Sequence, residues 1–339
     1  MLAWVFAAVS WTAPPIAGPG GPVLDVQQRA ATGIQPKSVV ASPDGSTLVV
    51  CNFGEDRRDN VFVYDTETLT HTATVTFEGT AVESAFAPDS KTVYVTNFAR
   101  GVVEVIDVAD ARVTREIGVG ANPKTIVVSP DGAAGYVANW SSKSVTVLDL
   151  SAGIVDYEIE TGRRPRGLAI GSDGTLFVAP MWDHQVHVYP AGATKPSVEK
   201  RVCSYPRHLV MAPDESAVFV SCSGNRRMRW LSPAPLTVRG QARAGHNPRT
   251  LDVSADGRYA ATADFHSDTV SVVDLQTMTR RVNDVPGVDG LVGLAFDPKA
   301  PLRIFVTSWR TNELLALVGD VADAEPEPPE DDARTAGER

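Results

Sequence analysis

The feature of this sequence that most constrains its fold is a tight-turn signature that returns about every 42 residues. The signature is "SPDG" at Ser42, and related four-residue turns follow along the chain, the last being "DPKA" at Asp297. The turn aspartates of the first six units are spaced by 45, 42, 42, 41 and 42 residues: Asp44, Asp89, Asp131, Asp173, Asp214 and Asp256. Self-similarity at a fixed period of this length indicates a repeat architecture.

Each unit contains four segments with the composition of short β-strands. An apolar segment precedes the turn, and segments such as "TVYVTNF", "VVEVIDV" and "VTREIGVG" follow it. The 27 glycines and 24 prolines interrupt the chain too often for long helices. Four short antiparallel strands in about 40 residues make one blade of a β-propeller, so the sequence predicts an all-β, seven-bladed propeller.

The seventh unit lacks its fourth strand, because the chain becomes acidic after the third. The segment "VLDVQQRAATG" at residues 23–33 has the form of a fourth strand and precedes the first complete unit. We expect it to pair with the last unit and close the ring, which removes the exposed sheet edges of an open propeller. The predicted propeller therefore covers residues 23–320.

The two ends of the chain differ in composition from the repeats. Residues 1–22 are apolar and then rich in small residues and proline, which resembles a secretory signal, although the usual basic residues are absent. The alternative is an ordered N-terminal arm packed on the body. Residues 321–339 hold seven acids and two arginines, a composition typical of a disordered tail. We expect a periplasmic or secreted protein, and the apolar run before Pro14 is too short to span a membrane.

The charge balance bears on the partners. The formal net charge is −10, and no basic stripe is evident. Nucleic acid is therefore not an expected partner, since its phosphates require such a stripe. We expect a monomer that binds a small-molecule anion or a protein partner.

The strand ends carry a family resemblance. "YVTN" at Tyr94 and "YVAN" at Tyr136, with the following "VEVID" and "VTVLD", resemble the YVTN-family seven-bladed β-propeller repeats of bacterial and archaeal surface and periplasmic proteins. The resemblance covers about residues 23–320. Relatives of this shape include lactonases, lyases, redox subunits and proteins without known activity, so the resemblance implies the fold and leaves the function open.

In a propeller blade, the start of the first strand and the end of the second lie at the same rim of the central channel. Seven residues before the turn aspartate, five of the seven blades have a cation: Lys37, Lys124, Arg166, Arg207 and Arg249. Nine residues after it, allowing one insertion in the last unit, six blades have an aromatic residue: Phe53, Phe98, Trp140, Trp182, Phe265 and Trp309. Together these rings predict a ligand that is partly flat or apolar and carries a carboxylate, phosphate or enolate.

A structural interpretation of the same residues stays open. The cations can pair with acids of the neighbouring loops, namely Glu55, Asp56 or Asp183, and the aromatic side chains can act as wedges between blades. Several like charges at one rim repel each other unless an anion relieves them, which favours binding.

Two residues break a ring of small side chains six residues before the turn aspartate. Glu83 occupies this position in the second blade and His208 in the fifth. They are candidates for general base and general acid, with Arg166, Arg207 and Arg249 stabilising an anionic intermediate. The alternative is that Glu83 neutralises Lys124 and that His208 is a hydrogen-bonded channel histidine.

A metal site is a further possibility near the fifth blade. The candidate ligands are His184, Cys203, His208 and Cys222, a soft set suited to copper or zinc. Their spacing matches no fixed motif, and a disulfide between Cys203 and Cys222 is favoured if the protein is exported.

Three functions follow from these patterns. The leading hypothesis is an exported propeller that binds an anionic small molecule, or an acidic segment of a partner, at the basic and aromatic rim. The alternative is a cofactor-independent hydrolase, lyase or isomerase that uses Glu83, His208 and Arg207. A second alternative is a metal-dependent oxidoreductase centred on the fifth blade. The sequence names no cofactor, and a bound metal ion is the alternative to none.

Overall fold

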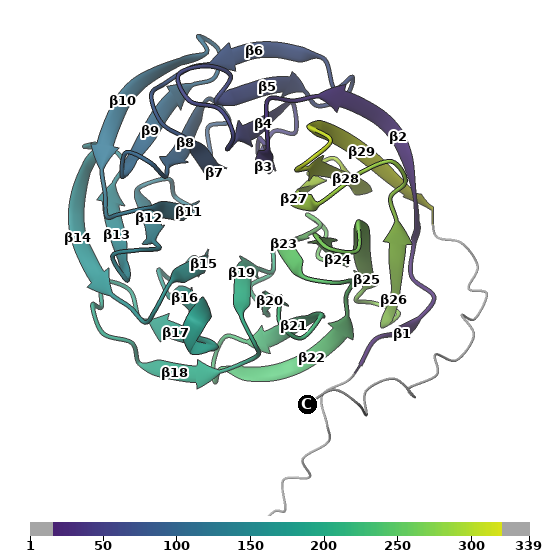
Figure 1. Ribbon diagram of the computed structural model, residues 1–339. Helices are drawn as coiled ribbons and strands as arrows, with labels where there is room; N and C mark the ends of the chain where they lie inside the picture. The colour runs from purple at the N-terminus through teal and green to yellow at the C-terminus, as the bar shows by residue number, and fades with distance from the viewer. Residues whose placement is uncertain (1–15, 321–339) are drawn as a thin grey trace, which may run out of the picture.

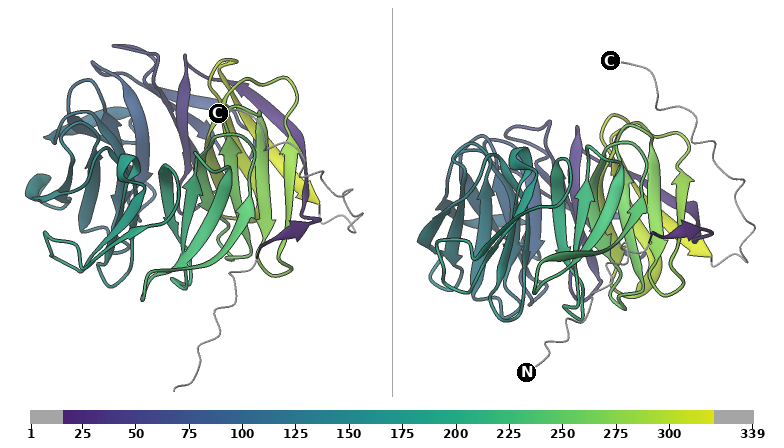
Figure 2. Two further views of the ribbon diagram at one scale, coloured as in Figure 1. Left: turned by 60° about the horizontal axis from the view of Figure 1, so that its bottom comes forward. Right: turned by 90° about the horizontal axis from the view of Figure 1, so that it is seen from below.

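The computed structural model describes residues 16–320, which form a ring of seven four-stranded antiparallel sheets around a central channel (Figure 1). This confirms the all-β, seven-bladed architecture. The one helical turn in this range is η1 (Met181–Asp183). Seen from the side, the blades form a short cylinder (Figure 2).

Each blade is built outward from the channel. The innermost strands are β3 (Pro36–Ala41), β7 (Ala81–Phe86), β11 (Pro123–Val128), β15 (Pro165–Ile170), β19 (Pro206–Met211), β23 (Pro248–Val253) and β27 (Leu291–Asp297). The second strands are β4 (Thr47–Asn52), β8 (Thr92–Asn97), β12 (Ala134–Asn139), β16 (Leu176–Pro180), β20 (Val218–Cys222), β24 (Tyr259–Asp264) and β28 (Ala300–Ser308). The third strands are β5 (Val61–Asp65), β9 (Val102–Asp107), β13 (Ser144–Asp149), β17 (Gln185–Tyr189), β21 (Arg227–Ser232), β25 (Thr269–Asp274) and β29 (Glu313–Asp320). The outer strands are β6 (His71–Val75), β10 (Arg112–Gly118), β14 (Ile154–Glu160), β18 (Val198–Arg201), β22 (Thr237–Arg243), β26 (Thr279–Asp284) and β2 (Val23–Ala31).

The first and last parts of the propeller close the ring together. Strand β2 pairs antiparallel with β29, with Val23 opposite Asp320 and Ala31 opposite Glu313. The predicted closure by residues 23–33 is therefore confirmed. It gives the seventh blade its fourth strand, so that this blade has no missing edge.

Residues before β2 extend the sixth blade. Strand β1 (Gly18–Pro19) pairs in parallel with β26 of this blade, and the backbone N–H of Ala17 donates to the carbonyl of Gln241 on β22 of the fifth blade. Residues 1–15, most of the predicted signal peptide, and the predicted acidic tail at 321–339 lie outside the described residues. Within residues 16–320, no helix has the length and apolarity to cross a membrane.

Hydrogen bonds explain the repeating turn. The Ser42 hydroxyl donates to Asp44 Oδ1 at 2.6 Å, and the backbone N–H of Ser46 donates to the same oxygen at 3.0 Å. These bonds hold the pKa of Asp44 at about 2. Gly45 has φ +63°, the left-handed conformation that favours glycine in such turns. The turn thus fixes each hairpin between the first and second strands.

A second contact, repeated in several blades, joins the loop before the blade to the end of its second strand. The Asn52 side chain packs so closely on Gly33 that a Cβ there would lie 2.6 Å from Nδ2, and Gly120 meets Asn139 in the same way. In the fifth blade, cysteines occupy both places: Cys203 and Cys222 form a disulfide. The fifth blade therefore replaces a packing contact by a covalent bond.

The hydrophobic core is divided among the blades. Buried aliphatic and aromatic side chains from neighbouring sheets form one cluster per interface, such as Val272, Phe296 and Leu315 between the sixth and seventh blades. Because the clusters lie between sheets, the channel itself is left to the side chains of the innermost strands.

Candidate functional site

The five predicted cations lie at one end of the channel, because each occupies the same place in an innermost strand. Every one follows the proline that begins its strand, as Lys37 follows Pro36 and Arg207 follows Pro206. The pairing with the second strand is irregular at this point in each of these blades. A bulge alters the direction of a side chain, and proline needs no hydrogen-bond acceptor at a strand start. We call this ring of Lys37, Lys124, Arg166, Arg207 and Arg249 the cation rim.

The cation rim is largely buried, and its basic side chains act on one another. Burial and the charges of Arg166 and Arg207 hold the pKa of Lys37 well below its ordinary value. Burial and the nearby Arg166 also lower the pKa of Lys124 to about 7. Nε of Arg166, Arg207 and Arg249 is buried, and none of these atoms has a hydrogen-bond partner among residues 16–320. The rim therefore holds positive charge and unused donors together.

Glu83 gives the rim one ion pair. Its Oε1 accepts from Arg166 at 2.9 Å, and its Oε2 accepts from the Thr125 hydroxyl at 2.6 Å. Within residues 16–320, the other four cations form no ion pair with a carboxylate. The direct ion pair of Glu83 is with Arg166, and the charge of Glu83 also favours the protonated form of Lys124.

The loop acids do not neutralise the rim either. Glu55 pairs with Arg58 at 3.3 Å, and Asp183 pairs with Arg163 at 2.6 Å. Asp56 accepts from the backbone N–H of Gly79. The alternative in which these acids balance the rim cations is therefore wrong.

The predicted aromatic side chains surround the cations and contact each other between blades. The Lys124 ammonium lies 4.0 Å from the centre of the Phe98 ring, and the Arg249 guanidinium lies 3.2 Å from that of Phe265. The remaining contacts include Lys37 with Trp309 at 5.4 Å, Phe53 with Phe98 at 5.9 Å, Phe53 with Trp309 at 5.7 Å, and Trp140 with Trp182 at 6.5 Å. These side chains thus make both the predicted ring at the channel and the contacts between blades.

Trp182 and the fifth blade depart from this pattern. Trp182 is 45% exposed and packs against Arg164, which does not belong to the rim. The fifth blade has Ser223 in place of an aromatic residue, and its hydroxyl donates to the carbonyl of Tyr205. The aromatic ring is therefore open at the fifth blade, beside the disulfide.

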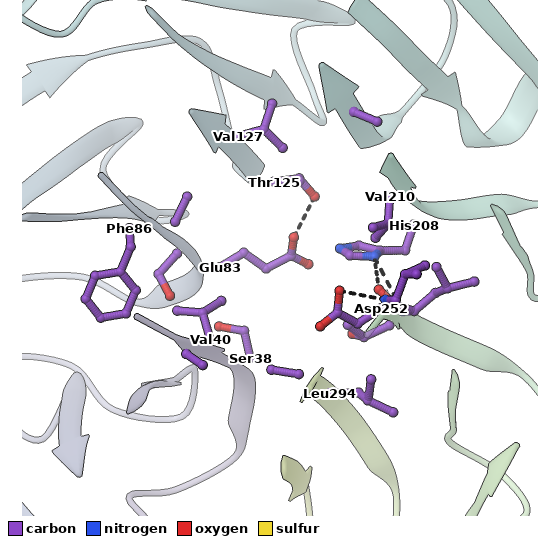
Figure 3. Close-up of a pocket in the computed structure, with 18 of the residues that line it drawn as sticks. Ser38, Val40, Glu83, Phe86, Thr125, Val127, His208, Val210, Asp252 and Leu294 are labelled. Atoms are coloured by element: carbon purple, nitrogen blue, oxygen red, sulfur yellow. Dashed lines mark hydrogen bonds between the residues drawn. The ribbon is translucent and has the colours of Figure 1, made fainter. Parts of the chain in front are cut away.

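Glu83 and His208 point toward one another from opposite sides of the channel (Figure 3). His208 Nδ1 lies 2.9 Å from the carbonyl oxygen of Leu251 and 3.4 Å from the backbone nitrogen of the same residue. The shorter contact favours the tautomer with the hydrogen on Nδ1, which leaves Nε2 as an acceptor. Burial lowers the pKa of His208. Burial alone would raise the pKa of Glu83, but Arg166 and His208 outweigh it and lower that pKa. Burial thus favours the neutral imidazole of His208, and the ion pair with Arg166 favours the charged carboxylate of Glu83.

Below this pair, the channel opens into a cavity of about 500 Å³ that continues to the turn end of the strands. Asp252 lies in its wall, a residue that the sequence analysis missed. Four residues before the turn aspartate, the other blades have small or branched apolar side chains: Val40, Ala85, Val127, Ala169, Val210 and Ala295. A comparison of the repeats at this position would have found Asp252.

Asp252 joins the sixth blade to the seventh. One carboxylate oxygen accepts from the backbone N–H of Phe296 at 2.9 Å, and the other accepts from that of Val253 at 2.8 Å. Burial raises the pKa of Asp252 to about 6.

The candidate metal ligands do not form the predicted site. The disulfide occupies the sulfurs of Cys203 and Cys222, as the sequence analysis favoured, so neither is a free thiolate. His184 Nδ1 accepts from the backbone N–H of Tyr205 at 3.0 Å, and His208 is bonded to Leu251. Among residues 16–320, no group of three or more His, Cys, Asp or Glu side chains is arranged to hold a metal ion.

These features define a seven-bladed propeller with a basic, aromatic-lined channel mouth. The family model described as "Lactonase, 7-bladed beta-propeller" matches residues 21–201, which is more than half of the chain. The chain therefore belongs to this family of seven-bladed lactonase-type propellers. A search of curated proteins gave no significant sequence match.

Solved structures with the same fold are distant in sequence. Hydrazine synthase from Kuenenia stuttgartiensis superposes with a TM-score of 0.74 at 19% identity, over 94% of this chain and 100% of that one. The β-propeller domain of Cps50 (Swd1) from Myceliophteria thermophila gives a TM-score of 0.76 at 12% identity, over 87% and 99% of the two chains. At these identities the likeness concerns the fold alone.

Proposed function

We propose that this protein binds a small organic anion at the cation rim, with the surrounding aromatic side chains packed on the ligand's flat or apolar part. The observation that carries the proposal is the charge balance, since five basic side chains, three of them arginines, converge on the channel and one carboxylate, Glu83, forms an ion pair with them. Buried charge without a partner is costly, and an anion would relieve it. The buried Nε groups of Arg166, Arg207 and Arg249 offer donors for carboxylate or phosphate oxygens.

The test of binding is a calorimetric titration of the full chain with benzoate, phthalate and inorganic phosphate. We expect phthalate to bind more tightly than benzoate, because two carboxylates meet more of the rim. The affinity for phosphate, which has no aromatic ring, shows how much of the binding comes from charge alone. Equal or absent binding of all three would contradict the proposal.

A second candidate function is hydrolysis of a lactone that carries a carboxylate, and family membership together with the Glu83–His208 pair favours it. His208 Nε2 would accept a proton from water as the oxygen adds to the lactone carbonyl. The arginines of the rim would stabilise the resulting oxyanion, and the proton would then pass to the leaving ring oxygen. Glu83 would stabilise the imidazolium.

This activity has its own test. A panel of carboxylated lactones is assayed with the native chain, His208→Ala and Glu83→Gln. We expect both variants to lose activity, and the acidic limb of the pH profile to fall below the ordinary pKa of histidine, 6.5. Unchanged turnover in His208→Ala would exclude this mechanism while leaving anion binding intact.

Export is part of the proposal. The disulfide between Cys203 and Cys222 supports it, since such bonds persist in oxidising compartments. Fractionation of cells that produce the full chain tests the location, and a cytoplasmic signal alone would contradict it.

A further inference from the structure

The channel contains a second chamber that differs in charge from the cation rim. The cavity of about 500 Å³ extends from the layer of Glu83 and His208 to the turns at Pro43 and Pro298, and its lining includes no lysine or arginine. Its charged side chains are the two carboxylates, Glu83 and Asp252. We call this cavity the turn-side chamber.

The polar groups of the turn-side chamber are mostly acceptors. The carboxylate of Asp252 and Nε2 of His208 face the cavity, and Figure 3 places Ser38 between the apolar side chains nearby. The Ser38 side chain is buried, and its hydroxyl has no hydrogen-bond partner among the described residues. A ligand that supplies donors would suit the carboxylate of Asp252 and Nε2 of His208, since a buried acceptor without a partner is unfavourable.

The rest of the wall is apolar. Small and branched side chains occupy the position of Asp252 in the other blades, Leu294 lies near Asp252, and Phe86 lies on the opposite side of the cavity. A volume of about 500 Å³ lies within the usual range for small-molecule sites, and such sites combine an apolar wall with a few polar groups. Asp252 supplies a charged group at a position where the other blades have apolar side chains.

We propose that the turn-side chamber is a second ligand site, which takes a small organic ammonium ion with its cationic head at Asp252 and its apolar body against the surrounding wall. The bonds from the backbone N–H groups of Phe296 and Val253 hold the carboxylate in place, and each carboxylate oxygen keeps a further acceptor position. A charge-assisted bond to an ammonium would fill that position.

The site does not depend on the anion proposed at the rim. Its ligand is of opposite charge and enters from the turn end, where Pro43, Ala255 and Pro298 line the cavity. Substitution of Arg207 would therefore leave it intact, and the two proposals can fail separately.

Three probes of equal length test the proposal on the full chain: hexylammonium, 1-hexanol and hexanoate. At about pH 8 the carboxylate of Asp252 is ionised, and we expect hexylammonium to bind about tenfold more tightly than hexanol, with hexanoate weakest. The measurement is calorimetry, with ligand-observed NMR for the weaker probes. The proposal would be overturned by the native protein alone if hexanol bound as tightly as hexylammonium, or if hexanoate bound most tightly.

Variants locate the probe. Asp252→Asn should weaken hexylammonium binding about tenfold and leave hexanol unchanged. The matched control is Asp264→Asn, because Asp264 is a buried carboxyl of the same blade that is bonded to Ser271 and Gly245 outside the chamber. Ala169→Phe should weaken both probes by filling the cavity, and it provides the test if Asp252→Asn does not fold. Unchanged hexylammonium affinity in Ala169→Phe would place the probe elsewhere and overturn the proposal.

Discussion

The carboxylate of Glu83 lies 2.9 Å from the guanidinium of Arg166, and this pair joins the second blade to the fourth across the buried mouth of the channel. Their side chains are 11% and 6% exposed, so each charge depends on the other for compensation. The remaining cations of the rim have no such partner among residues 16–320. This relationship separates the part of the rim that is compensated by a carboxylate from the part that is not.

Breaking the pair should destabilise the protein. Glu83→Gln leaves Arg166 buried without its counter-charge, and we expect a loss of about 3 kcal/mol in the free energy of unfolding. Combining Glu83→Gln with Arg166→Met should recover much of that loss, because the uncompensated charge is removed. Denaturant unfolding of the four proteins in this double-mutant cycle measures the coupling, and additive losses would contradict the account.

Removing an unpaired rim cation should have the opposite effect on stability. Arg207→Met takes away a charge that has no ion-pair partner, so we expect stability to rise by about 1 kcal/mol while the affinity for phthalate falls about tenfold. Arg112→Met is the control, since Arg112 lies exposed on the outer strand β10. If Arg207→Met were destabilising and bound phthalate normally, Arg207 would have a structural role.

Anion binding should take up protons. The pKa of Lys124 is lowered to about 7 from an ordinary value of 10.5, so the unfolded chain binds more protons between these values. Stability of the unliganded protein should therefore rise with pH over that range. A bound anion favours the charged ammonium, so affinity should fall as pH rises above about 7. Calorimetry at pH 8 in two buffers of different ionisation enthalpy measures the uptake, and binding without uptake would contradict this role for Lys124.

The disulfide should stabilise the fifth blade beyond the contact it replaces. Cys203 and Cys222 are separated by 19 residues, and a loop of about this length corresponds to about 3 kcal/mol in the unfolded-state model. We expect Cys203→Ser with Cys222→Ser to lose about that amount. The pair Cys203→Gly with Cys222→Asn, which restores the residues of other blades, should lose less. Thermal unfolding compares them, and equal losses would show that the repeated glycine–asparagine contact does not substitute for the bond.

The fold could be predicted from the sequence because the same pattern of strands and turns occurs seven times. Asp44 and its equivalents fix the turns, and the strand at residues 23–33 could be assigned from the missing strand of the last unit. The rim could be predicted for the same reason, since a residue's place in the repeat gives its height in the channel.

The details of the site were harder to predict because they depend on contacts between blades. The spacing of the repeats could not show that Glu83 pairs with Arg166, which is two blades away, rather than with Lys124, which is in the adjacent blade. It also could not show the tautomer of His208, which the carbonyl of Leu251 sets. Asp252 could be found from the sequence, because the other blades have apolar side chains at its position in the repeat.

The most direct test of the central claim is a crystal structure of the full chain grown with phthalate. We expect density for the two carboxylates among Arg166, Arg207 and Lys124, with the ring against the aromatic side chains of the rim. A rim that holds only water at a saturating concentration of phthalate, or phthalate bound elsewhere, would contradict it.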